Sequence, residues 1–166
     1  MHRVALISTG GTIEKTYDEL RGVLENRVSV LDVMLGSLEL RGVHITRVAL
    51  MNKDSLEMTP EDHQLIAERV RALYDSQDAI VIVHGTDRLA ETGEVIAAVP
   101  PPIPVILTGA MRPYELRSTD ALQNLTEALL AAQLVAPGVY LAMHNQVLAF
   151  PGVVKDRAQG TFVKRA

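Results

Sequence analysis

The chain has 166 residues, of which 48% are hydrophobic and 22% charged, a composition typical of a globular domain with a buried core. Its formal net charge of -4 argues against an extended basic surface for nucleic acid. Cysteine is absent, so disulfides, thiolate metal sites and cysteine nucleophiles are excluded.

The apolar runs in the chain are short. None approaches the roughly 18 consecutive apolar residues of a membrane span. The first residues, MHRVALISTGG, lack the long apolar run of a secretory signal peptide and indicate a strand that begins at once. We therefore expect a cytoplasmic protein that binds neither membrane nor nucleic acid.

Strand-like and helix-like segments alternate from the start of the chain. An apolar run predicts a buried strand over 3–7, and a polar stretch that contains one glycine predicts a mobile loop over 14–26. Leucines at helical spacing predict a helix over 28–40. Residues 43–51 alternate enough in polarity to predict a second strand.

The clearest helical pattern covers residues 59–75. Thr59 is a suitable N-cap, Pro60 fits the first helical turn, and the two acidic residues that follow favour the positive end of the helix dipole. The alternation then continues. Further strands are expected over 78–85, 105–109 and 138–145, and further helices over 89–99 and 118–135.

Five strands separated by helical crossovers predict an α/β domain with a parallel sheet. We expect a flavodoxin-like or Rossmann-like three-layer sandwich with a mainly parallel five-stranded sheet. No internal repeat and no long linker divides the chain, so residues 1–166 are expected to form a single domain.

Polar residues follow several of the expected strands, at the edge where ligands bind in such sheets. The first strand leads to Thr12 in TGGT, and the third leads to Thr86 and Asp87 in HGTD. Ser55 follows the second strand, and Lys155 lies in the segment after the fifth. This collection of hydroxyl, carboxylate and ammonium groups at one sheet edge is typical of an enzyme.

The same residues also have purely structural interpretations. Thr12 could be a turn residue or a helix cap, Asp87 could cap the next helix, and Ser55 could form a turn. Lys155 could be a solvated surface lysine. His84 follows an apolar strand and is expected to be packed and hydrogen-bonded.

Cofactor and metal sites have no support in the sequence. The glycines of TGGTIEK match neither a phosphate-binding P-loop nor a dinucleotide-binding motif. The five histidines lack the spacing of a zinc site. We therefore expect neither a cofactor nor a metal.

Four motifs occur in order along the chain: STGGTIE, DSLEMTPED, VHGTDRLAETG and LTGAMRPYELRSTDALQNL. Together they resemble the bacterial-type L-asparaginase family, over essentially the whole chain but only over the family's N-terminal domain. The resemblance implies a short single-domain form without the usual C-terminal domain. It also implies an amidohydrolase that converts L-asparagine to L-aspartate and ammonia, with possible weak glutaminase activity, and a homo-oligomer, either dimer or tetramer.

The resemblance assigns catalytic roles residue by residue. Thr12 matches the nucleophilic threonine, and Thr86 with Asp87 matches a second threonine and its neighbouring carboxylate. Lys155 matches the lysine that partners this second threonine. Tyr17, in the expected loop, matches only loosely the tyrosine that supports the nucleophile, because the loop varies in length.

The resemblance also implies a substrate-binding set. Ser55 matches the serine that holds the α-carboxylate, and Asp87 offers a carboxylate to the α-ammonium group. Gly11 and Asp54 flank these residues and complete the expected set. Backbone N–H groups near Thr86 or Ala110 are expected to hold the developing oxyanion.

Two positions depart from the family pattern. Arg88 follows HGTD where threonine is common, and Leu56 follows Ser55 where many members have a polar residue. In the two-domain enzymes a neighbouring subunit's second domain completes the site. Without that domain we expect a more open site and weaker substrate binding.

Three other functions remain possible from the sequence. The first is a non-catalytic domain that binds an amino acid and has lost turnover. The second is a flavodoxin-like nucleotide or flavin binder, which the 4% aromatic content disfavours. The third is the ammonia-releasing subunit of a tRNA amidotransferase, for which we expect a basic RNA-binding extension that the sequence does not show.

Overall fold

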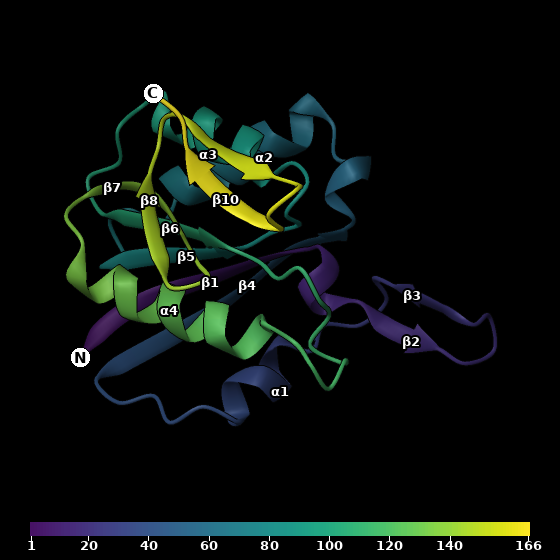
Figure 1. The fold of residues 1–166 in the computed structure, drawn as a ribbon. Helices are drawn as coiled ribbons and strands as arrows, with labels where there is room; N and C mark the ends of the chain where they lie inside the picture. Colours follow the sequence, from purple (N-terminus) through teal and green to yellow (C-terminus); the bar gives the residue numbers. More distant parts are fainter.

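A computed structural model describes all 166 residues. Its centre is a six-stranded sheet in the order β4-β1-β5-β6-β7-β8 (Figure 1). Neighbouring strands are parallel from β4 to β7, and β8 alone is antiparallel to its neighbour. The strands are β1 (His2–Gly10), β4 (Val43–Lys53), β5 (Ala79–Val83), β6 (Pro104–Thr108), β7 (Gly138–Met143) and β8 (Gln146–Ala149).

Four helices cover the two faces of this sheet and make a three-layer sandwich. They are α1 (Leu31–Gly36), α2 (Pro60–Arg71), α3 (Leu89–Ala97) and α4 (Ala121–Leu134). All are too short or too polar to traverse a bilayer.

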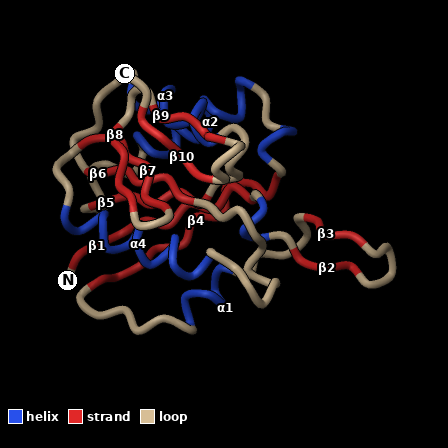
Figure 2. The backbone as a smooth tube through the Cα atoms, viewed as in Figure 1, coloured by secondary structure: helices blue, strands red, loops and turns tan.

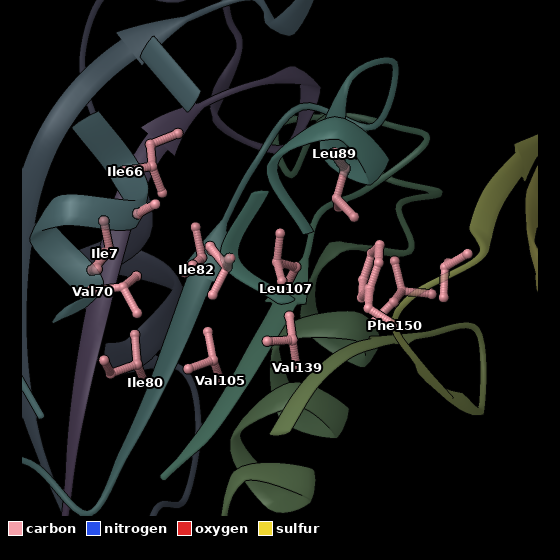
Figure 3. Packing of buried hydrophobic residues seen from close by; sticks show 14 of the residues in the cluster. Ile7, Ile66, Val70, Ile80, Ile82, Leu89, Val105, Leu107, Val139 and Phe150 are labelled. Carbon is pink, nitrogen blue, oxygen red and sulfur yellow. The ribbon is translucent and has the colours of Figure 1, made fainter. Parts of the chain in front are cut away.

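Side chains alternate along the strands between the two faces, so each face has its own core. Ile80 and Ile82 of β5 pack with α2 and α3, around Val70 and Leu89 (Figure 3). The intervening Val81 packs on the other face with α1 and α4. Because both faces of β5 are covered, all five of its residues are buried, as expected for a central parallel strand.

Two short hairpins extend from this core. Strands β2 (Thr16–Asp18) and β3 (Val23–Glu25) form an antiparallel pair that projects from the body of the molecule (Figures 1 and 2). Strands β9 (Val153–Asp156) and β10 (Thr161–Lys164) form a second pair near α3. The fully buried Phe162 anchors this second hairpin in the core that contains α2 and α3.

The expected α/β architecture with its parallel strands is confirmed, and the sheet has one strand more than the five expected. The sixth strand exists because His144 and Asn145 both adopt positive φ, 54° and 61°, and turn the chain back onto β7. Such a turn between two antiparallel strands normally favours Asn or Gly.

Several expected boundaries differ from the structure. The 14–26 segment contains the β2–β3 pair rather than only a loop, and the helix expected over 28–40 is limited to α1. Two 3-10 turns were not expected, η1 (Thr12–Glu14) and η2 (Ser55–Glu57). In contrast, the start of α2 is as expected, with a capping box at Thr59 and proline in the first turn.

Candidate active site

Three loops pack closely at the carboxyl ends of β1, β4 and β5, with glycine at the two contacts between them. A Cβ placed on Gly11 would lie only 2.4 Å from the Cα of Gly85. A Cβ placed on Gly85 would lie 2.6 Å from the Cβ of Ser55. Because only glycine permits these approaches, the loops pack directly against one another and bring Thr12, Thr86 and Ser55 to one edge of the sheet.

Lys155 connects the β9–β10 hairpin to this edge. Its Nζ donates hydrogen bonds to Oγ1 of Thr86 at 2.8 Å and to Oδ1 of Asp87 at 2.9 Å. The Lys155 side chain is only 16% exposed, and Thr86 is buried. The structure therefore joins three of the residues that the sequence singled out, although Lys155 is 69 positions from Thr86.

Asp87 has a second cationic neighbour that the sequence reasoning missed. Nη1 of Arg157 lies 2.9 Å from the same Oδ1 atom that Lys155 contacts. Burial alone would raise the pKa of Asp87, but the hydrogen bond from Lys155 and the charges of both cations outweigh it. The pKa of Asp87 therefore lies below its ordinary value, which keeps the carboxylate charged.

Ser55 and Asp54 lie together at the start of η2. The buried Ser55 accepts a hydrogen bond at Oγ from the backbone N–H of Arg88 at 3.2 Å. Asp54 caps η2 through the N–H of Leu56 and pairs with Nζ of Lys15 at 2.7 Å. The hydrogen bond from Lys15 is the main cause that lowers the pKa of Asp54.

Thr12 begins η1, directly after the glycine turn. The turn is braced by Glu14, whose buried carboxylate accepts hydrogen bonds from the N–H of Gly10 at 3.1 Å and from Oγ of Ser29 at 2.6 Å. Burial raises the pKa of Glu14. No hydrogen bond within the chain involves the Thr12 hydroxyl, so this group is available to a ligand.

Tyr17 lies apart from these contacts. It sits on the projecting β2–β3 pair, is 54% exposed, and its backbone N–H donates to the Glu115 carboxylate. No hydrogen bond joins its hydroxyl to Thr12. The structure therefore does not bring Tyr17 together with the other expected residues.

A surface hollow of about 340 Å³ lies between the β2–β3 pair and η2. Its lining residues are mostly polar: Lys15, Leu24, Glu25, Asn26, Asn52, Asp54 and Glu57. None of the surface hollows is lined by Thr12, Thr86 or Lys155. The openness that the sequence leads us to expect at this edge therefore stays a prediction.

The loop after β6 supplies backbone donors beside this edge. A Cβ placed on Gly109 would lie 2.3 Å from the carbonyl oxygen of His84 and 3.3 Å from Cγ2 of Thr86. The next residue, Ala110, is buried. The backbone N–H groups of Thr86 and Ala110 donate no hydrogen bond within the chain, so both are available to a developing oxyanion.

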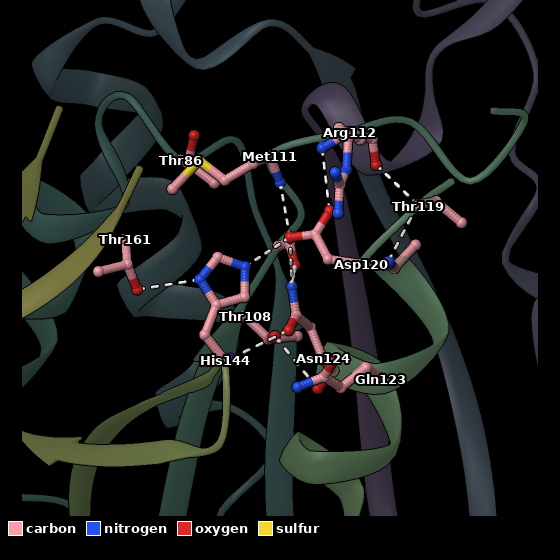
Figure 4. A network of polar contacts seen from close by, with 12 residues as sticks. Thr86, Thr108, Met111, Arg112, Thr119, Asp120, Gln123, Asn124, His144 and Thr161 are labelled. Atoms are coloured by element: carbon pink, nitrogen blue, oxygen red, sulfur yellow. Dashed lines mark hydrogen bonds and ion pairs between the residues drawn. The ribbon is translucent and has the colours of Figure 1, made fainter. Parts of the chain in front are cut away.

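A polar network fixes this loop relative to the β9–β10 hairpin (Figure 4). The Asp120 carboxylate accepts hydrogen bonds from the N–H groups of Met111 and Arg112, each at 3.0 Å. His144 lies between Asp120, 2.7 Å from its Nε2, and Thr161 of β10, 2.9 Å from its Nδ1. The network thus connects the loop that contains Ala110 to the hairpin that carries Lys155.

Sequence reasoning missed Asp120 and His144 as network residues, because it placed Asp120 within the helix expected over 118–135 and His144 within the strand expected over 138–145. Asp120 occupies the N-cap position but makes no capping hydrogen bond through its side chain. For His84 the expectation is confirmed. Its buried ring contacts the carbonyl of Gly85 at 2.7 Å and the hydroxyl of Thr92 at 2.7 Å.

No group of three or more histidine, aspartate or glutamate side chains is arranged to hold a metal ion. The site instead offers two threonine hydroxyls, a lysine ammonium group, a charged carboxylate and unpaired backbone N–H groups. This combination can hold an amide substrate and stabilise negative charge on its carbonyl oxygen.

Comparison with known proteins gives consistent matches. A family model described as "Asparaginase, N-terminal" matches residues 3–162. An L-asparaginase from Thermococcus kodakarensis is 33% identical over 160 residues, which cover 95% of this chain and 49% of that protein. One component of a glutamyl-tRNA(Gln) amidotransferase from Methanococcus vannielii is 30% identical over 150 residues, covering 89% of this chain and 35% of that protein.

Solved structures agree with these matches. The thermostable L-asparaginase from Thermococcus kodakarensis superimposes with a TM-score of 0.88 at 34% identity, over 98% of this chain and 51% of that chain. L-asparaginase I from Vibrio cholerae gives a TM-score of 0.80 at 29% identity, and the match covers 98% of this chain and 51% of that chain. The chain spans about half the length of the asparaginases it matches. Since the family model covers almost all of its residues, the chain belongs to the asparaginase family and corresponds to the family's N-terminal domain.

Proposed function

We propose that this domain carries the reacting groups of an amidohydrolase that converts L-asparagine to L-aspartate and ammonia. The observation that carries the proposal is the hydrogen-bonded group of Lys155, Thr86 and Asp87. It lies beside the glycine contact that brings the loop of Thr12 against that of Thr86. The similarity to an L-asparaginase over 95% of the chain supports the same function.

In the proposed reaction Oγ1 of Thr12 attacks the side-chain amide carbon of asparagine. A new C–O bond forms, the C–N bond breaks, and the amide nitrogen leaves as ammonia with the proton that Thr12 loses. We assign the relay of that proton to Thr86 and Lys155, whose side chains are joined by a hydrogen bond. Water then attacks the acyl-threonine, releasing aspartate and restoring the Thr12 hydroxyl.

The binding groups are assigned from the family resemblance and from the chemistry of the side chains. Ser55 is assigned to the α-carboxylate and Asp87 to the α-ammonium group, with Gly11 and Asp54 beside them. The free N–H groups of Thr86 and Ala110 are assigned to the oxyanion, a contribution commonly worth about 3–4 kcal/mol per donor. Tyr17 can contribute only if the β2–β3 pair moves toward Thr12 when substrate binds.

Ammonia release from L-asparagine and L-glutamine tests the proposal. Thr12→Ala should lower turnover on the order of a thousandfold, because it removes the attacking oxygen. Thr126→Ala is a matched control, since Thr126 lies on α4 and donates only to the carbonyl of Leu122. If Thr12→Ala keeps more than a few per cent of the wild-type turnover, another residue is the nucleophile.

Thr86→Val and Lys155→Met test the relay separately. Each should reduce turnover strongly while the fold stays intact, as judged by circular dichroism and thermal unfolding. Near-normal turnover in both variants would contradict the assignment of Thr86 and Lys155. If the wild-type protein releases no ammonia yet binds L-aspartate, a non-catalytic amino-acid-binding domain becomes the better description.

A second candidate function has its own observation. Several matched proteins are components of glutamyl-tRNA(Gln) amidotransferases, at 29–32% identity over 86–89% of this chain. In that case the domain would supply ammonia to a partner protein. Much faster ammonia release from glutamine than from asparagine would favour this function.

The domain is also proposed to act as a homo-oligomer, a dimer or a tetramer, because the open edge around Thr12 needs a covering surface to hold substrate out of water. Light scattering at the concentration of the activity assay tests this. A monomer with full activity would remove the need for a shared site.

A further inference from the structure

Asp87 is the residue assigned to the substrate's α-ammonium group, yet two cationic side chains already surround it. Nζ of Lys155 and Nη1 of Arg157 each lie 2.9 Å from the same carboxylate oxygen, Oδ1. No hydrogen bond within the chain reaches the other oxygen, Oδ2. A substrate ammonium therefore has one free oxygen to bind, on a carboxylate that already faces two positive charges.

Arg157 differs from Lys155 in what else it does. Lys155 is largely buried and also donates to Thr86, so it belongs to the proton relay. Arg157 is 69% exposed, makes no other ion pair, and carries a guanidinium group. It contributes a fixed positive charge at the mouth of the site and touches none of the proposed reacting atoms.

The position of Arg157 is set by the hairpin turn. It directly follows β9, and the Asp156 carboxylate accepts hydrogen bonds from the N–H groups of Ala158 and Gln159, both at 3.0 Å. Both bonds end on Oδ1 of Asp156, and the Arg157 side chain extends to Asp87. The cluster of Lys155, Asp87 and Arg157 then carries one more positive than negative charge.

The geometry points to Arg157 as a specificity-determining residue that weakens the preference for amides with an α-ammonium group. Arg157 favours amides whose only charged group is a carboxylate. Succinamate, which is asparagine without its amino group, is such an amide. The inference rests on the proposed amidohydrolase function and names its substrate class more closely. Under this inference the site prefers substrates with an α-amino group only modestly and does not require one.

The expected size of the effect follows from Coulomb's law. An ammonium bound to Oδ2 would lie roughly 6 Å from the Arg157 guanidinium, given ordinary hydrogen-bond lengths on both sides of a carboxylate. At an effective dielectric constant near that of water, repulsion across this distance changes the binding constant about threefold. Added salt should reduce the effect, because the guanidinium is exposed.

The test compares kcat/KM for L-asparagine and succinamate. In Arg157→Gln the ratio of the two values should rise about threefold in favour of asparagine, through KM rather than kcat. Arg157→Lys keeps the charge and should retain the wild-type ratio. Arg41→Gln removes an equal charge at 92% exposed Arg41, just before β4 at the far end of the sheet, and should change nothing.

An unchanged ratio in Arg157→Gln, or an equal rise in Arg41→Gln, overturns the inference while leaving the amidohydrolase intact. If the wild-type protein hydrolyses neither amide, the proposed function fails, and calorimetric binding of L-aspartate and succinate decides the inference instead. A threefold rise in the affinity for L-aspartate relative to that for succinate, in Arg157→Gln, supports the inference. No shift, or no binding of either compound, overturns it.

Discussion

The buried His84 should make the protein less stable in mild acid. Burial, together with the neighbouring His63, lowers the pKa of His84 from 6.5 to about 4, although its hydrogen bond to the Gly85 carbonyl opposes the shift. In the unfolded chain the imidazole recovers its ordinary pKa. Between pH 6.5 and pH 4 the unfolded state therefore binds more protons than the folded state, and stability falls as the pH falls.

The magnitude follows from the two pKa values. Each pH unit across this window changes the free energy of unfolding by about 1.4 kcal/mol, so moving from pH 7 to pH 5 should remove roughly 2 kcal/mol through His84 alone. Below pH 4 both states bind the proton and the loss stops growing. Above pH 6.5 the imidazole of His84 is neutral in both states, so this loss of stability is absent.

Urea unfolding of the wild-type protein and of His84→Gln, each at pH 7 and pH 5, isolates this contribution. Gln is uncharged at both values, so the variant should lose about 2 kcal/mol less than the wild type between them. Any constant cost of the substitution cancels in this comparison. If the two proteins lose equal stability within about 0.5 kcal/mol, His84 does not carry the shifted pKa that its burial implies.

Three further predictions concern close contacts in the structure. Gly85→Ala places a Cβ 2.6 Å from the Cβ of Ser55, so we expect a loss of about 1–3 kcal/mol in a thermal melt and a raised KM for asparagine; wild-type values for both would rule out the contact. Asp120→Asn replaces the charged acceptor of the Met111 N–H and should lower the free energy of unfolding in urea by about 1–3 kcal/mol, and a change within error would mean that the network is not formed. Thr59→Ala removes the capping side chain of α2 and should lower that free energy by about 1 kcal/mol, whereas an unchanged urea midpoint would show that the Asp62 half of the capping box suffices.

The parts of the fold that the sequence predicts well are those set by local patterns. The apolar run around β5 and the capping residues of α2 each determine their element without help from distant residues. Strand β8 could not be predicted in this way. It is a mostly exposed edge strand of four residues, and it depends on a turn in which His144, not glycine, adopts positive φ.

The candidate site shows the same division. Thr12, Thr86 and Asp87 lie two to four residues beyond the ends of β1 and β5, so strand prediction alone brings them to one edge. Lys155 reaches that edge only because its hairpin folds back over the sheet, and the family resemblance, not periodicity, indicated it. Arg157 was missed because its contact with Asp87 spans 70 positions and depends on the geometry of a turn.

The β9–β10 hairpin has a consequence for how the protein would lose activity. It is paired only with itself, and it is held to the body of the molecule by Val153 and Phe162 in the core, by Thr161 on His144, and by its two cations on Asp87. Such an appendage can detach while the central sheet stays folded, because only two of its side chains are buried in the core. Amides of β10 should then exchange with deuterium faster than those of β5. Heating should then abolish the proposed activity at a lower temperature than it unfolds the domain, since Lys155 leaves with the hairpin.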